Sequence, residues 1–190
     1  MNLPNKLTVL RMALVPVFVV FMFADGIANN YIIAFFIFIV ASFTDMLDGQ
    51  IARKNNLVTD FGKFMDPLAD KILVMSAMLC LVQMKYVPAW VVIVILSREF
   101  LVTSLRLIAA GQGTVIAADK LGKYKTVCQM AWLGLALISA WVYDIGVGSV
   151  QLADTMLMLC NGLMWLSLIL TVVSGVNYVV KNKNCISTMK

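Results

Sequence analysis

Four aspartates in a fixed pattern are the residues of this chain best suited to chemistry. They stand in the arrangement Asp45-x2-Asp48-Gly49-x2-Ala52-Arg53-x8-Gly62-x3-Asp66-x3-Asp70. The segments on either side, 31–43 and 72–82, are almost wholly apolar. An ionisable side chain beside apolar segments of this kind is costly enough to indicate a function. The pattern therefore predicts an acidic site in or next to a membrane.

The spacing of the aspartates predicts that they converge. Asp45 and Asp48 are three residues apart, and Asp66 and Asp70 are four apart, so each pair shares one face of a helix. Two antiparallel helices joined by a short loop bring such pairs together. Pro67 leaves two geometries open, because it either kinks the second helix from within or occupies its first position after Asp66 as N-cap.

Clustered carboxylates in low-dielectric surroundings take up protons unless cations balance them. The chain has no histidine, and its four cysteines form no CxxC pair, so we expect neither a zinc site nor a disulfide. Oxygen ligands favour hard cations, Mg²⁺ or Mn²⁺. Two such ions can stabilise the entering and leaving oxygens of an in-line phosphoryl displacement, and Arg53 suits a diphosphate.

Composition excludes a soluble domain. Of the 190 residues, 62% are hydrophobic and 13% charged, whereas soluble domains have roughly 45–50% apolar residues. The net charge of +5 is spread between apolar segments, which predicts contact with anionic membrane lipids and no nucleic-acid partner. The first apolar segment resembles a signal peptide, but no small-x-small cleavage site precedes Asp25, so we expect a retained helix.

Six apolar segments are long enough to cross the roughly 30 Å of bilayer hydrocarbon. They cover residues 7–23, 31–53, 61–82, 88–109, 122–143 and 150–180. The breaks between them are short, and no internal repeat is visible. The sequence therefore predicts an all-α integral membrane protein, a six-transmembrane-helix bundle that forms a single domain over residues 1–190.

The distribution of positive charge predicts the orientation. One set of loops and termini holds Lys6, Arg11, Arg53, Lys54, Lys63, Lys120, Lys123, Lys125, Lys181, Lys183 and Lys190, whereas the opposite loops hold only Lys85. By the positive-inside rule, both termini and the aspartate pattern face the cytoplasm. We expect a multi-pass protein of the cell inner or plasma membrane.

The aspartate pattern matches the signature of the CDP-alcohol phosphatidyltransferase family without a departure, so the chain resembles that family. The resemblance implies a homodimer of six-helix subunits in which the aspartates hold two divalent ions. It also implies that a CMP-activated donor transfers its phospho-substituent to an alcohol and releases CMP.

Further features resemble the bacterial phosphatidylglycerophosphate synthase branch of the family. They are the opening Asn2-Leu3-Pro4-Asn5-Lys6-Leu7-Thr8 with Arg11, the run Asp66-Pro67-Leu68-Ala69-Asp70-Lys71, Arg98-Glu99-Phe100 with Arg106, and Gly122-Lys123-Tyr124-Lys125-Thr126. The implied substrates are CDP-diacylglycerol and glycerol 3-phosphate, and the implied products are phosphatidylglycerophosphate and CMP.

The resemblance also implies residue roles. Asp45, Asp48 and Asp66 would be metal ligands, while Asp70 would bind a metal and act as the catalytic base. Residues expected to line the CDP-diacylglycerol site are Asn5, Thr8, Gly49, Ala52, Arg53 and Gly62.

Binding of the acceptor phosphate needs cations, and the candidates are Lys63, Arg98, Arg106, Lys123 and Lys125. Arg98 lies about 15 Å along its helix from Pro88, at 1.5 Å per residue, which is near mid-membrane. We do not expect it to pair with Glu99, because adjacent residues on a helix do not face each other. For Lys123 and Lys125, an ordinary place in a cytoplasmic loop is an equal alternative.

Three other functions stay open. A family relative would use another alcohol, such as inositol phosphate or serine. An intramembrane prenyltransferase also uses aspartate-rich helices with Mg²⁺, but its motifs are differently spaced. A divalent-cation transporter would place carboxylates within the membrane, although the repeated halves or paired broken helices that transporters often have are not visible.

Overall fold

The computed structural model describes residues 3–24, 26–54, 60–111, 120–146 and 150–182, without the side chains of 3, 4, 45–64, 66, 67, 70, 110, 111, 120 and 150. These residues form six helices: α1 Leu3–Met22, α2 Asn30–Lys54, α3 Asp60–Gln83, α4 Ala89–Gly111, α5 Lys120–Ile145 and α6 Val150–Lys181. Each corresponds to one predicted segment, with ends that differ by a few residues. The predicted fold class, an all-α membrane protein of six helices, is confirmed.

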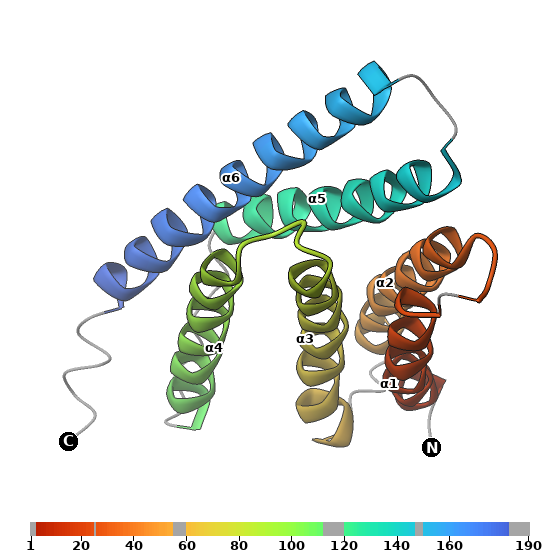
Figure 1. Ribbon diagram of the computed structural model, residues 1–190. Helices are drawn as coiled ribbons and strands as arrows, with labels where there is room; N and C mark the ends of the chain where they lie inside the picture. The colour runs from red at the N-terminus through yellow and green to blue at the C-terminus, as the bar shows by residue number, and fades with distance from the viewer. Residues whose placement is uncertain (1–2, 25, 55–59, 112–119, 147–149, 183–190) are drawn as a thin grey trace.

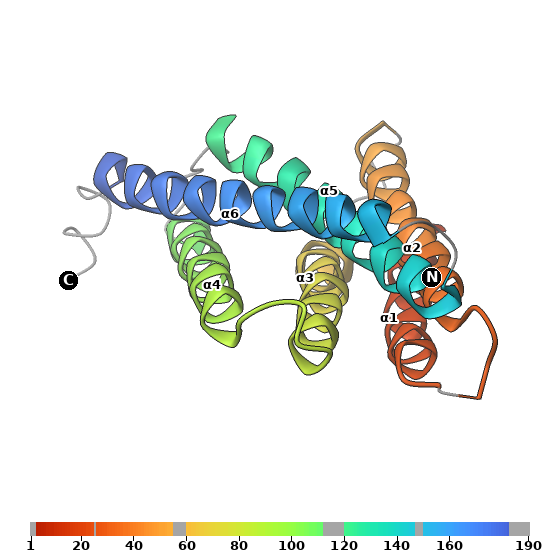
Figure 2. The ribbon, with the colours of Figure 1, turned by 45° about the horizontal axis from the view of Figure 1, so that its top comes forward.

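Helices α1 to α4 lie side by side, and α5 and α6 form an antiparallel pair that crosses them obliquely (Figures 1 and 2). The most extensive packing joins α5 to α6 and α1 to both α2 and α3, while α4 packs mainly on α6. Helix α6 is the longest of the described helices. Its 32 residues measure roughly 48 Å at 1.5 Å per residue, longer than the roughly 30 Å of hydrocarbon, and tilting is one way to accommodate this excess.

Apolar character is unevenly distributed among the described helices. Segments Asn5–Met22, Leu121–Ile145 and Gln151–Lys181 are long and apolar enough to cross a membrane, and Asn30–Thr44 and Lys71–Gln83 are shorter apolar helical segments. In the sequence, the apolar run of α2, residues 31–43, precedes Asp45, and that of α3, residues 72–82, follows Asp70. Helix α4 differs, because Arg98, Glu99 and Arg106 interrupt its apolar sequence.

A packed aromatic pair joins α1 to α2, one of the two helices that carry the aspartates. The rings of Phe18 in α1 and Phe38 in α2 have centroids 6.2 Å apart, and both side chains are buried, as is Trp132 of α5. Aromatic pairs in contact favour such tilted geometry. These contacts lie one to two turns from the aspartate segment of α2, and they hold it against α1.

The helix ends bring the two aspartate pairs to one end of the molecule. The start of α1, the end of α2, the start of α3 and the end of α4 lie at this common end (Figure 1). Helix α3 begins at Asp60, so Pro67 lies inside it, and the alternative that placed Pro67 at the first helical position is wrong.

Candidate functional site

A polar face of α1 points into the protein near the aspartates. Asn5, Thr8 and Arg11 recur at intervals of three residues and are 8%, 0% and 1% exposed. The Arg11 Nε donates to the carbonyl oxygen of Ala41 in α2, 3.3 Å away, one turn before Asp45. This face therefore lies against the helix that carries the first two aspartates.

Arg11 adds a buried cation to the site. Its place on the cytoplasmic side stays a prediction, and its side chain is buried between helices. A buried guanidinium needs hydrogen-bonding partners and a counter-charge, and a helix rich in aspartates supplies a suitable setting. The signal was present in the sequence, because Arg11 continues the three-residue spacing of Asn5 and Thr8.

The predicted metal centre can be assessed only from the helices. Asp45 and Asp48 belong to the last part of α2, and Asp66 and Asp70 to the first part of α3, and these two helices pack together. All four offer hard oxygen donors, which fits Mg²⁺ or Mn²⁺. Their side chains lie outside the described part, as do the predicted site residues Gly49, Ala52, Arg53, Gly62 and Lys63 apart from their backbone. Among the side chains that the structure describes, no group of three possible metal ligands occurs.

A cationic cavity lies between α3, α4 and α5. Its volume is about 760 Å³, and it is lined by Lys71, Arg98, Glu99, Val102, Thr103, Arg106, Gly122, Lys123, Thr126 and Val127. Three of the five predicted acceptor-phosphate residues, Arg98, Arg106 and Lys123, thus share one cavity. Lys71 joins them, and sequence reasoning gave it no role although it directly follows Asp70. The cavity therefore suits a small, multiply charged anion.

Arg98 is held from two sides. Its Nη1 donates to Glu99 Oε1 and its Nη2 to Ser174 Oγ of α6, each at 2.9 Å. The buried Nε has no hydrogen-bond partner among the described residues. The prediction that Arg98 and Glu99 do not pair is wrong, because two long side chains can meet although their Cβ atoms diverge. The guanidinium keeps N–H groups for a ligand.

Close approach of α6 to α4 depends on a glycine. A Cβ added at Gly175 would lie 2.9 Å from Cγ of Arg98, whereas one at Gly162, also on α6, would meet nothing within 4 Å. Real Cβ atoms do not approach carbon so closely, and Cγ is not the free end of the side chain. Gly175 therefore lets the Arg98 side chain lie flat against α6.

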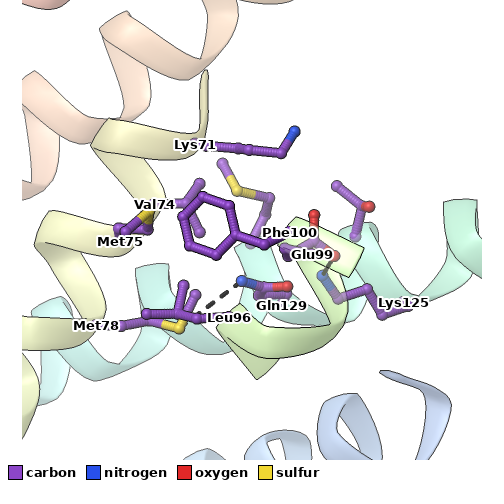
Figure 3. Close-up of a pocket in the computed structure, with 11 residues that line it drawn as sticks. Lys71, Val74, Met75, Met78, Leu96, Glu99, Phe100, Lys125 and Gln129 are labelled. Carbon is purple, nitrogen blue, oxygen red and sulfur yellow. Dashed lines mark hydrogen bonds and ion pairs between the residues drawn. The ribbon is translucent and has the colours of Figure 1, made fainter. Parts of the chain in front are cut away.

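Lys125 is separated from the cationic cavity. It is 2% exposed, its Nζ lies 2.6 Å from Glu99 Oε1, and it lines a smaller pocket with Met75, Met78 and Gln129 (Figure 3). The loop alternative is therefore wrong for Lys125, which is a buried helical residue. Lys123, in contrast, is exposed.

Arg106 closes the other side of the cavity. It is exposed, and its guanidinium carbon lies 5.5 Å from the ring centroid of Tyr178 in α6. At that distance the ring face attracts the cation. Helix α6 therefore orients both arginines of α4, Arg98 through Ser174 and Arg106 through Tyr178.

The motif, the helical architecture and the cationic cavity agree with a comparison against protein families. The model of CDP-alcohol phosphatidyltransferases matches residues 1–173. The chain belongs to the CDP-alcohol phosphatidyltransferase family. Its match to that family includes both aspartate pairs and every described residue of the cavity.

Several curated relatives that are similar to this chain carry the name CDP-diacylglycerol–glycerol-3-phosphate 3-phosphatidyltransferase. The protein of Bacillus subtilis (strain 168) is 44% identical over 98% of this chain and 98% of its own length. That of Rickettsia typhi is 35% identical over 93% of this chain and 94% of its own. That of Haemophilus influenzae is 37% identical over 75% and 77%.

The contact between Gly175 and Arg98 predicts an asymmetric response of two glycines on α6. Gly175→Ala should destabilise the protein by about 1–3 kcal/mol, the usual cost of overpacking. Gly162→Ala should be neutral or stabilising by up to about 1 kcal/mol, because alanine favours helix. Thermal unfolding in detergent checks both. Equal midpoints for the two variants would contradict the close packing of Arg98 on α6.

Proposed function

We propose that the protein transfers the phosphatidyl group from CDP-diacylglycerol to glycerol 3-phosphate, giving phosphatidylglycerophosphate and CMP. The observation that supports this most is the single cavity lined by Lys71, Arg98, Arg106 and Lys123. A phosphomonoester carries up to two negative charges and pairs well with guanidinium groups. Serine has no phosphate to use these cations, so the cavity favours a phosphorylated acceptor. The names of the relatives favour glycerol 3-phosphate over inositol phosphate.

The donor would bind at the aspartate end of α2 and α3. In this proposal Asp45, Asp48, Asp66 and Asp70 hold two divalent cations, Mg²⁺ or Mn²⁺. When bound, these ions would neutralise the donor diphosphate and stabilise the charge that develops during in-line displacement. The CDP moiety would be lined by Asn5, Thr8, Gly49, Ala52, Arg53 and Gly62. Support comes from the buried polar face of α1, which contains Asn5 and Thr8.

The proposed reaction is one displacement at phosphorus. A hydroxyl oxygen of glycerol 3-phosphate attacks the phosphorus that bears diacylglycerol, the bond from that phosphorus to the CMP oxygen breaks, and CMP leaves. The carboxylate of Asp70 accepts the hydroxyl proton. Arg98, Arg106 and Lys123 bind the acceptor phosphate and so hold its hydroxyl within reach, which replaces a bimolecular encounter by an oriented one.

The proposed setting follows from the charges and the helix ends. The chain is one domain of the cell membrane, residues 1–190, with both termini and the reaction site on the cytoplasmic side, where glycerol 3-phosphate is available. The common end of α1 to α4 (Figure 1) supports a single site. A homodimer completes the proposal, as the family resemblance implies.

An acceptor panel tests the proposed function. Purified protein with CDP-diacylglycerol and Mg²⁺ or Mn²⁺ should release CMP with glycerol 3-phosphate and much less with inositol phosphate or serine, and chelation should stop release. Asp70→Asn should slow turnover by about 100-fold or more, since a lost general base costs that much or more. Asp154→Asn, an exposed carboxylate of α6, is the matched control. Equal release with serine, or normal turnover of Asp70→Asn, would contradict the proposal.

Arg98→Gln should impair the acceptor much more than the donor. A hydrogen bond to a charged group is worth about 1.5–3 kcal/mol, which corresponds to roughly a 10-fold to 100-fold rise in the KM for glycerol 3-phosphate. If the contact tightens during attack, kcat falls as well. Binding of CMP should be unchanged. Lys6→Gln, which removes an exposed cation outside the cavity, should have no effect, and an unchanged acceptor KM in Arg98→Gln would remove Arg98 from the acceptor site.

Single cysteines test the orientation. In a background without the four natural cysteines, Asp144→Cys, at the exposed end of α5, should react with an impermeant maleimide added outside intact cells. Lys6→Cys should react only after lysis, because positive charge is retained on the cytoplasmic side. Labelling of both positions from the same side would contradict the proposed six-span topology.

A further inference from the structure

Glu99 joins Arg98, a half-buried cation of α4, to Lys125, a buried cation of α5. A single oxygen, Oε1, accepts from Arg98 Nη1 at 2.9 Å and from Lys125 Nζ at 2.6 Å. The three side chains are 14%, 3% and 25% exposed for Arg98, Lys125 and Glu99. A carboxylate placed between two cations in so dry an environment restricts both of them.

Glu99 also forms the wall between two cavities. It lines the cationic cavity together with Arg98, and it lines the smaller methionine-rich pocket together with Lys125 (Figure 3). Arg98 is absent from the lining of the smaller pocket, and Lys125 from that of the larger one. Glu99 therefore lies between the ammonium of Lys125 and the acceptor cavity, and Lys125 does not line that cavity.

We propose that Glu99 is a positioning residue for acceptor recognition, which orients the guanidinium of Arg98 while Lys125 balances its charge. The proposal rests on the proposed function, because it assigns Arg98 to the phosphate of the acceptor. It removes Lys125 from the residues that touch that phosphate. Glu99 itself touches neither substrate.

Charge arithmetic explains why a carboxylate is tolerated beside an anion site. Arg98 and Glu99 alone would be neutral as a pair and would attract a phosphate weakly. With Lys125 the three groups carry a net charge of +1. Of their two cations, it is the guanidinium of Arg98 that lines the cavity. That group has five N–H donors, of which Glu99 and Ser174 engage two. Because Nε is buried, one N–H on each of Nη1 and Nη2 remains for the acceptor, and the direction of these two donors is fixed before the acceptor arrives, which lowers the entropic cost of binding.

A mutant cycle tests the proposal. Glu99→Gln should raise the KM for glycerol 3-phosphate about tenfold, because the hydrogen bond that orients Arg98 loses its charge, and should leave the KM for CDP-diacylglycerol unchanged. In an Arg98→Gln background the same change should raise the acceptor KM no further, since residues that act as a unit are not additive. Asp154→Asn is again the control.

Two alternatives give different results. If Lys125 bound the acceptor directly, Glu99→Gln would release both cations and lower the acceptor KM or leave it unchanged, which would overturn the proposal. If Glu99 only stabilised the fold, its effect would persist in the Arg98→Gln background, which would also overturn it.

A second variant covers the case in which Glu99→Gln removes a charged partner of Lys125 and does not fold. Glu99→Met with Lys125→Met replaces the ion pair by unbranched apolar side chains, a change that proteins often tolerate. This double variant should have a parental unfolding midpoint and an acceptor KM raised about tenfold. If the parent protein releases CMP with glycerol 3-phosphate and the double variant has the parental acceptor KM, the proposed role of Glu99 is overturned while the proposed function stands. A parent without that activity would overturn the proposed function first.

Discussion

Every charge that this protein carries among its apolar helices must be balanced within the protein. A carboxylate or guanidinium in low-dielectric surroundings is stable only when it is paired or hydrogen-bonded. Near the end of α2 and the start of α3 the need is for positive charge, because four aspartates lie there. In the middle of α4 the need is reversed, and Glu99 and Ser174 stabilise the buried part of Arg98. The aspartate site thus has an excess of negative charge, and the cavity beside α4 has an excess of positive charge.

Much of the fold could be predicted because a membrane segment has a strong sequence signal. The six helices agree with six apolar segments to within a few residues, and breaks at glycine, proline or polar clusters separate them. The oblique course of α5 and α6 could not be predicted in the same way. The number of apolar residues sets the reach of a helix but not its direction, which depends on the neighbours against which it packs.

The candidate site was predicted less completely than the fold, because the sequence did not indicate in which direction each side chain points from its helix. Lys123 and Lys125 look alike in the sequence, yet one is exposed and the other is 2% exposed, because two positions along a helix point in widely different directions. For Arg98 and Glu99 the sequence predicted no contact, whereas their side chains form an ion pair. The rule that neighbours diverge describes their Cβ atoms, and long side chains can overcome it. Such side-chain paths depend on the space left by other helices, here by Gly175 on α6, and no local pattern records that space.

In the proposed function, helix α3 would connect the donor site to the acceptor site. Asp70 ends the aspartate pattern, and Lys71, the next residue, lines the cationic cavity. Successive residues of an α-helix are turned by about 100° around its axis. One turn of α3 can therefore face the aspartate site on one side and the cationic cavity on the other. In the proposed function, the base at Asp70 would come between the two substrates along the helix. A rigid helix there would fix the distance between the acceptor hydroxyl and the donor phosphorus, whereas a loop would leave that distance free to vary.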